Sequence, residues 1–185
     1  MPKSADRGRR TREQLLDAAA QLVGEVGWGA VTTRLVAERA GVNAALVHYH
    51  FSSVPELLST AALQFAERVL AESAEVLRGS EPADGIGRVL GELSRYTGTD
   101  PESLLLAEAF LAAHRLPELR ASLAALVADF RSRVASWLQD AGVKDADAVA
   151  LLLGATIDGL VLHRALDESV DFHAVAAPLR RLVAG

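Results

Sequence analysis

The stretch of sequence that decides the fold reads TTRLVAERAGVNAALVHYHF over residues 32–51. One of its two threonines starts a short helix, which ends at Ala40–Gly41 because glycine permits a tight reversal of the chain. Asn43 then caps a second short helix, Ala44–Phe51, in which Val47 and the final phenylalanine point to the same side. Two short helices joined by a glycine-containing turn, behind a longer helix, are typical of a helix-turn-helix unit.

The longer helix should open at Thr11, where Gln14 completes a capping box, and end at Gly27. Further helices are indicated by apolar residues that recur every three or four positions. We expect them at about residues 55–78, 86–96, 101–114, 117–137, 145–166 and 172–184. Pro101 and Pro117 mark two of these starts, because proline suits the first helical turn. Pro178 lies inside the last segment, so that helix either bends or begins there.

Composition favours an all-α protein without catalytic motifs. Half of the 185 residues are hydrophobic, only nine are aromatic, and Ala and Leu make up about a third of the chain. The chain has no cysteine, which excludes disulfides, cysteine-ligated metals and thiol nucleophiles. It also lacks a nucleophile elbow, a zinc-protease motif and a phosphate-binding loop, so we expect no enzyme. Pattern alone still allows a plain helical hairpin in an all-helical core.

Residues 10–60 resemble the DNA-binding domain of the tetracycline-repressor (TetR) family of transcriptional regulators. The segments that carry the resemblance are Gly24–Trp28, Thr32–Ala37, Ala40–Asn43, Leu46–Ser53 and Glu56–Leu58. The resemblance implies an all-α protein of about nine helices. Its three-helix DNA-binding domain would occupy residues 1–52, and a larger ligand-binding and dimerisation domain would occupy residues 53–185. It also implies a homodimeric repressor that binds a palindromic operator in double-stranded DNA and is released by a small molecule.

The resemblance further implies which residues contact DNA. Thr33 and Arg34 match positions that contact phosphate and sometimes a base, and His50 matches a phosphate contact. The other residues on or beside the recognition helix are Asn43, Ala44, Ala45, Leu46, His48 and Tyr49.

Two positions depart from the family pattern, because His48 stands in place of the usual Tyr and Val54 in place of the usual Lys. That Lys is a phosphate contact at the start of the fourth helix, so the contact should be missing here. We expect the basic segment at residues 1–12, which includes Arg10, to compensate for it.

Base readout should be sparse, because the recognition helix contains no Arg, Lys, Asn or Gln to make bidentate contacts with bases. We expect Ala44, Ala45 and Leu46 to present apolar surface to thymine methyl groups. His48 and Tyr49 should donate hydrogen bonds to phosphate or a base edge, and Arg34 is the best candidate for guanine.

Charge is distributed unevenly along the chain, although the sum is only -5. Residues 1–52 carry seven basic and five acidic side chains, whereas residues 53–185 carry twelve and nineteen. The basic start of the chain is followed by no apolar segment, so no secretory signal is expected. The longest apolar stretch, Ala148–Ile157, is shorter than the roughly 20 residues that span a bilayer. We therefore expect a cytoplasmic protein with no membrane partner.

Polar residues that interrupt apolar helix faces are the candidates for contact with the effector, namely Tyr96, Glu108, Thr156 and Asp158. Each has an alternative role, because a buried acid is more often paired and a tyrosine on an apolar stripe is more often core. A pocket lined by Ala and Leu favours an apolar or amphipathic small molecule. We expect no cofactor and no metal site, since His48 and His50 lie two positions apart on a helix and point away from each other.

The helix expected at residues 145–166 is apolar nearly all round and therefore needs two partners. One partner is its own core, and the other is a second subunit. Gly154 and Gly159 would permit close backbone approach, and residues 172–184 supply a second amphipathic surface. Two helices from each subunit would then form a four-helix interface, as the family resemblance also implies.

A rival interpretation is a helical interaction protein that has lost sequence-specific DNA binding. The missing Lys at position 54 and the few base-reading side chains keep this interpretation open. Selection from random DNA duplexes would separate the two, because a pure interaction protein would enrich no palindrome.

Overall fold

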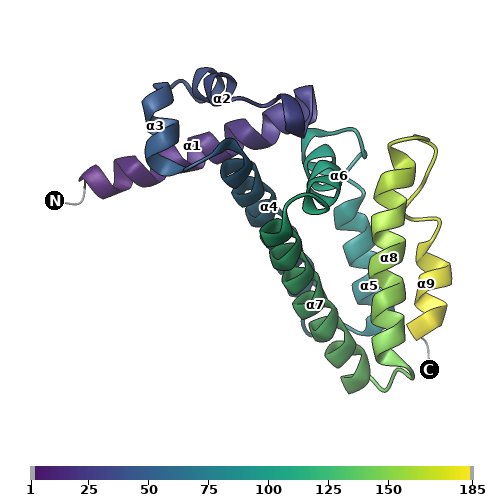
Figure 1. Cartoon of the computed structure of the whole chain (residues 1–185). Helices are drawn as coiled ribbons and strands as arrows, with labels where there is room; N and C mark the ends of the chain where they lie inside the picture. The colour runs from purple at the N-terminus through teal and green to yellow at the C-terminus, as the bar shows by residue number, and fades with distance from the viewer. Residues whose placement is uncertain (1–2, 184–185) are drawn as a thin grey trace. The chain divides into compact units, whose positions relative to one another are not determined.

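Figure 1 shows the computed structural model, which describes residues 3–183. Within this range the chain forms nine α-helices, one short 3-10 helix and no strand, so the all-α prediction is confirmed. The elements are α1 (Lys3–Val26), η1 (Trp28–Ala30), α2 (Thr33–Ala40), α3 (Ala44–His50), α4 (Val54–Leu77), α5 (Pro82–Leu93), α6 (Pro101–Ala113), α7 (Pro117–Asp140), α8 (Ala146–Arg164) and α9 (Ala176–Val183).

The helices group into two compact units. The first contains the chain up to Phe65 together with Asp100–Arg120, so α6 packs with the N-terminal helices. The second contains Ala66–Thr99 and the chain from Ala121 onward, where α5, α8 and α9 lie together. The domain boundary predicted after residue 52 falls inside the first of these packing units, and it remains a prediction.

Local capping interactions fix the ends of the two helices of the helix-turn-helix, as the sequence predicts. The Thr32 hydroxyl accepts a hydrogen bond from the Leu35 amide at 3.3 Å and caps α2. Gly41 adopts left-handed backbone angles (φ 67°, ψ 31°), and the amide of Val42 donates to the carbonyl of Ala37 at 2.9 Å. This is the Schellman arrangement, in which a left-handed residue satisfies the last carbonyls of a helix.

The start of α1 differs from the prediction, because the helix begins at Lys3 rather than Thr11. No proline or helix-ending glycine motif separates these positions. Asp6 lies in the first turn, where a negative charge suits the helix dipole, and it forms an ion pair with Arg9 at 2.9 Å. The capping box expected at Thr11 is therefore interior to a helix, and Arg10 is an exposed residue on its surface.

The first unit is held together where α1 meets α6. A Cβ atom placed on Gly24 would lie only 2.8 Å from the Cα atom of Pro101, so the two backbones approach closely. The Glu108 carboxylate of α6 accepts a hydrogen bond from the backbone amide of Trp28 at 3.3 Å. Asp100 caps α6 by accepting a hydrogen bond from the Ser103 amide at 2.9 Å, as its position before Pro101 predicts.

Two features of the C-terminal region refine the predicted helices. α9 begins at Ala176, which places Pro178 in the first helical turn, where its missing amide breaks no helical hydrogen bond. The helix is thus shorter than residues 172–184. Phe172 lies outside it, fully buried, with the guanidinium of Arg164 5.4 Å from its ring centre.

α8 presents much of its apolar surface to solvent in the single chain. Leu151, Leu152 and Leu162 are 54, 53 and 55% exposed. By length and composition α8 is also the one helix within residues 3–183 that could cross a membrane, although core helices of globular proteins pass the same criterion.

Candidate DNA-binding surface and effector cavity

Helix α3 is fixed from beneath by two apolar side chains. Val47 and Phe51 are each 2% exposed, as their four-residue spacing predicts. The Asn43 side-chain oxygen accepts a hydrogen bond from the Ala45 amide at 2.8 Å and caps the helix. The Arg12 guanidinium of α1 lies 5.1 Å from the centre of the Phe51 ring, a cation–π contact that ties α1 to the end of α3.

The opposite face of α3 is open to solvent. Ala44, Ala45, Leu46, His48 and Tyr49 are all exposed, and Tyr49 is the most prominent at 79%. The rings of Tyr49 and His50 meet edge to face, with centres 5.0 Å apart. The face therefore combines methyl groups with one phenol and two imidazoles, groups that can contact thymine methyls and phosphate oxygens.

The two arginines of α2 have different roles. Arg39 forms a bidentate pair with Glu25 of α1, with nitrogen–oxygen distances of 2.8 and 2.6 Å. Hydrogen bonds from Arg39 hold the pKa of Glu25 below its usual value. Arg34 is exposed in the first turn of α2 beside Thr33, and within the described part of the chain it makes no ion pair. Arg34 and Arg10 are therefore exposed basic side chains, while Arg39 is engaged in its ion pair with Glu25.

The turn between α3 and α4 is fixed without the lysine that the family usually carries. The Ser53 hydroxyl accepts a hydrogen bond from the Glu56 amide at 3.2 Å. The Glu56 carboxylate accepts hydrogen bonds from the Ser52 hydroxyl and, at 2.8 Å, from the Ser52 amide. These bonds hold the pKa of Glu56 below its usual value. Val54 thus opens α4 beside a hydrogen-bonded carboxylate, and the nearby charge of Arg12 on α1 lowers the pKa of Glu56 further.

The second unit contains a cavity of about 190 Å³. Its walls come from α5, α7 and α8, with Leu77 at the end of α4 and Leu179 of α9 closing it. Every lining residue is apolar except Arg131 on α7 and Asp158 on α8. A concave, mostly apolar space with a few polar groups is the usual form of a small-molecule site.

Asp158 is exposed in the single chain, yet the apolar groups around it remove part of its hydration and raise the pKa of its carboxyl group. The one polar atom of the Trp137 side chain is already hydrogen-bonded, since the indole nitrogen donates to the Ser80 carbonyl at 3.0 Å. The indole therefore offers the cavity an apolar surface.

Family models match both parts of the chain. The model for bacterial regulatory proteins of the tetR family matches residues 15–61, which contain the helix-turn-helix. The model for the tetracyclin repressor-like C-terminal domain matches residues 78–185, which contain the cavity. The chain belongs to the TetR family. This TetR-family protein is thus a helix-turn-helix transcriptional regulator from a DNA-binding family that is not enzymatic, which confirms the resemblance.

Relatives match this TetR-family protein along most of its length. The transcriptional regulator BetI of Agrobacterium fabrum is 30% identical over 170 residues, 90% of this chain and 82% of BetI. A transcriptional regulator from Rhodococcus sp. Rha1 is 26% identical, superposes with a TM-score of 0.80, and is aligned over 93% of each chain. The multidrug binding protein EbrR, solved with imidazole, is 30% identical with a TM-score of 0.67, over 100% of this chain and 95% of EbrR.

The four predicted effector contacts lie in different places in this TetR-family protein. Asp158 lines the cavity, whereas Tyr96, Glu108 and Thr156 do not. Thr156 donates its hydroxyl hydrogen bond to the Leu152 carbonyl within α8 at 2.7 Å, and Glu108 belongs to the contact between α1 and α6.

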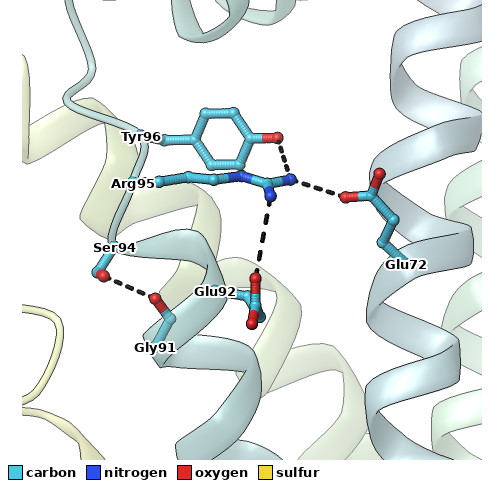
Figure 2. A network of polar contacts seen from close by, with 6 residues as sticks. All are labelled: Glu72, Gly91, Glu92, Ser94, Arg95 and Tyr96. Carbon is cyan, nitrogen blue, oxygen red and sulfur yellow. Dashed lines mark hydrogen bonds and ion pairs between the residues drawn. The ribbon is translucent and has the colours of Figure 1, made fainter.

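Tyr96 takes part in a polar network between α4 and the end of α5 (Figure 2). The Arg95 guanidinium stacks on the Tyr96 ring at 4.9 Å and donates to its hydroxyl at 3.0 Å and to Glu72 at 2.7 Å. These bonds raise the pKa of Arg95. The arginine also lies 3.9 Å from Glu92, so the network holds the end of α5 to α4.

Sequence reasoning missed the aromatic wall of the cavity. Phe130 and Trp137 share one stripe of α7 with Val134, and a stripe of this spacing predicts core packing. Both side chains line the cavity instead. Arg131, next to Phe130, was also missed, because a single arginine on a long amphipathic helix carries no signal of its own.

Proposed function

We propose that this TetR-family protein is a ligand-responsive repressor that binds a palindromic operator as a homodimer and is released by a small molecule. The observation that carries the proposal is the exposed face of α3, held by buried Val47 and Phe51 and bordered by the unpaired Arg34. A short capped helix that presents its side chains to solvent is the form that enters the major groove in helix-turn-helix proteins. The same function places the protein in the bacterial cytoplasm, where operator DNA lies.

The DNA contacts proposed for this surface divide into two groups. Asn43, Thr33, His50 and Arg10 would position the protein on phosphates, and Ala44, Ala45, Leu46, His48, Tyr49 and Arg34 would face the bases or the phosphates beside them. Phosphate contacts dominate affinity, so operator binding should weaken steeply with salt. Base readout would depend mainly on Arg34.

The homodimer is proposed through α8 and α9. Leu152, Gly159 and Leu162 follow the spacing of one face of α8 without a charged residue, and Leu166 follows just beyond the end of the helix. Leu166 is 90% and Leu182 of α9 is 45% exposed in the single chain. A second copy would cover these side chains, and it accounts for the apolar surface of α8 without a membrane. Two recognition helices would then lie about one DNA turn apart.

The effector is proposed to bind the cavity of the second unit as an apolar or amphipathic small molecule. A ligand that binds one state of the dimer more tightly than another shifts the population toward that state. If the favoured state spaces the recognition helices wrongly, the ligand and the operator oppose each other's binding by the same factor. Release from DNA follows from this linkage.

The test uses an operator selected from random duplexes, followed by gel-shift titration at fixed salt. Arg34→Ala and Tyr49→Ala should each weaken binding by about 1–3 kcal/mol, or roughly 5- to 150-fold, because each removes a base or phosphate contact. Arg88→Ala is the matched control, since Arg88 is exposed on α5 far along the sequence from the recognition helix. Unchanged affinity in both variants would contradict the assignment. Enrichment of no palindrome would instead favour the interaction protein without DNA binding.

A further inference from the structure

The chemistry of the cavity wall indicates which class of effector it accepts, an inference that rests on the proposed function. The wall is apolar except for one acidic and one basic side chain. An apolar wall contributes affinity without discrimination, so the charged and aromatic groups decide which molecules bind.

Asp158 is the group with most to gain from a ligand. Among the described residues no hydrogen bond or ion pair engages its carboxylate, which lies in the cavity wall. The side chain is exposed in the single chain, but the neighbouring apolar wall removes part of its hydration and raises its pKa. A carboxylate in such surroundings is stabilised by a positive charge that replaces the missing hydration. A cation bound beside Asp158 would supply that charge.

The aromatic residues of α7 point to the same chemistry. Phe130 and Trp137 both line the cavity, and the indole N–H of Trp137 is already bound to the Ser80 carbonyl. Aromatic faces attract cations, most of all amines and quaternary ammonium groups that are shielded from water. A carboxylate and two aromatic rings in one apolar cavity are complementary to an organic cation.

We propose that this cavity binds a compact hydrophobic cation, a protonated amine or a quaternary ammonium, whose charge lies at Asp158 and whose body lies against Phe130 and Trp137. The volume of about 190 Å³ accommodates a single ring or a branched alkyl group, since a cavity of roughly 150 Å³ holds benzene.

Arg131 does not make the cavity an anion site. Arg131 is exposed, and its long side chain can turn its guanidinium into water when a cation enters. Asp158 is exposed as well, but its side chain is too short to carry the carboxylate away from the wall in the same way. An anion at Arg131 would be repelled by the Asp158 carboxylate in the same small cavity. A cation at Asp158 would be repelled only by Arg131, whose guanidinium can move into water.

The test compares three ligands of one shape and different charge, namely benzylamine, benzyl alcohol and benzoate. Trp28→Phe leaves Trp137 as the only tryptophan of the chain, so its fluorescence reports binding at the cavity wall. We expect benzylamine to bind about tenfold or more tighter than benzyl alcohol, as a charge-assisted hydrogen bond implies, and benzoate to bind most weakly. Calorimetry on the unmodified chain gives the same constants independently.

Asp158→Asn is the decisive variant, and Asp147→Asn is its matched control in the first turn of α8, because Asp147 is an exposed aspartate that does not line the cavity. Asp158→Asn should bring the benzylamine and benzyl alcohol constants within about threefold of each other, while Asp147→Asn keeps the full difference. Equal binding of the amine and the alcohol by the unmodified chain would overturn the proposal, and so would preference for benzoate. Loss of a dimer in Asp158→Asn alone would also overturn it, because the partner of Asp158 would then be another subunit.

Binding is measured without DNA, so the cation site and the proposed repressor function are judged separately. Benzylamine that binds through Asp158 and also weakens operator binding in a gel shift supports both. Benzylamine that binds through Asp158 and leaves operator binding unchanged supports the cation site and contradicts release by this ligand.

Discussion

Asp158 should cost the free protein stability, because its ionised carboxylate is partly removed from water and has no partner among the described residues. Its pKa is higher in the folded chain than in the unfolded chain. The penalty is therefore absent below the unfolded value, about 4 for an aspartate, and fully present above the folded value.

We predict that Asp158→Asn raises the thermal midpoint of the ligand-free protein at pH 7. The gain should shrink as the pH is lowered through the titration of the carboxyl group, because protonated aspartate and asparagine are both neutral. Differential scanning calorimetry at several pH values measures this. Asp147→Asn should give no gain, since Asp147 is exposed in the first turn of α8, where its charge suits the helix dipole. An equal gain in both variants would attribute the effect to net charge alone.

At the scale of elements, the packing of α1 on α6 depends on one small residue. A Cβ at Gly24 would meet the backbone of Pro101 at 2.8 Å, and backbone cannot turn aside as a flexible side chain can. Gly24→Ala should therefore destabilise the protein by about 1–2 kcal/mol, because overpacking of about 1–3 kcal/mol outweighs the better helix propensity of alanine. Urea denaturation at equilibrium measures the change.

Gly8 provides the matched control in the same helix. Nothing lies within 4 Å of a Cβ placed there, so Gly8→Ala should stabilise the chain by up to about 1 kcal/mol. If both substitutions stabilise the protein equally, the close backbone contact between α1 and α6 at Gly24 is contradicted.

The elements were predictable where their signals act over three or four residues. Thr32, Gly41 and Asn43 each satisfy backbone groups within their own turn, and all three behave as the sequence indicates. The start of α1 was not predictable in the same way. Thr11 and Gln14 form an equally good capping pattern on paper, but nothing before them stops a helix, so it continues back to Lys3.

The candidate sites were predictable only in part, because a cavity depends on what packs opposite a helix. The α3 surface follows from one helix with a buried side, and spacing reveals that side. Phe130 and Trp137 have the spacing of core residues. They line a cavity because the residues of α5 and α8 that face them leave a space between the helices. Tyr96 and Glu108 interrupt apolar stripes as Asp158 does, but Arg95 and the amide of Trp28 engage them. Spacing along one helix cannot identify partners that lie 80 positions away.

At the scale of the whole molecule, the uneven charge and the exposed face of α8 suit an assembly of two chains on DNA. The net charge of residues 53–185 is negative, so phosphate repels this part and leaves the basic start and α3 as the favourable approach. A dimer through α8 would also remove the apolar side chains that a single chain leaves in water.

Gly159 tests this assembly directly. A Cβ placed there meets nothing within 4 Å in the single chain, so Gly159→Ala should leave the subunit intact and slightly favour α8. If α8 packs closely on its copy, the added methyl groups overpack the interface by about 1–3 kcal/mol, which raises the dimer dissociation constant at least about fivefold. Sedimentation equilibrium measures this constant. Gly91→Ala on α5, where a Cβ is equally free, should stabilise the chain without dissociating it. Equal dimer affinity in both variants would place the interface away from Gly159, whereas a selective loss in Gly159→Ala would place two copies of α8 in contact at this residue.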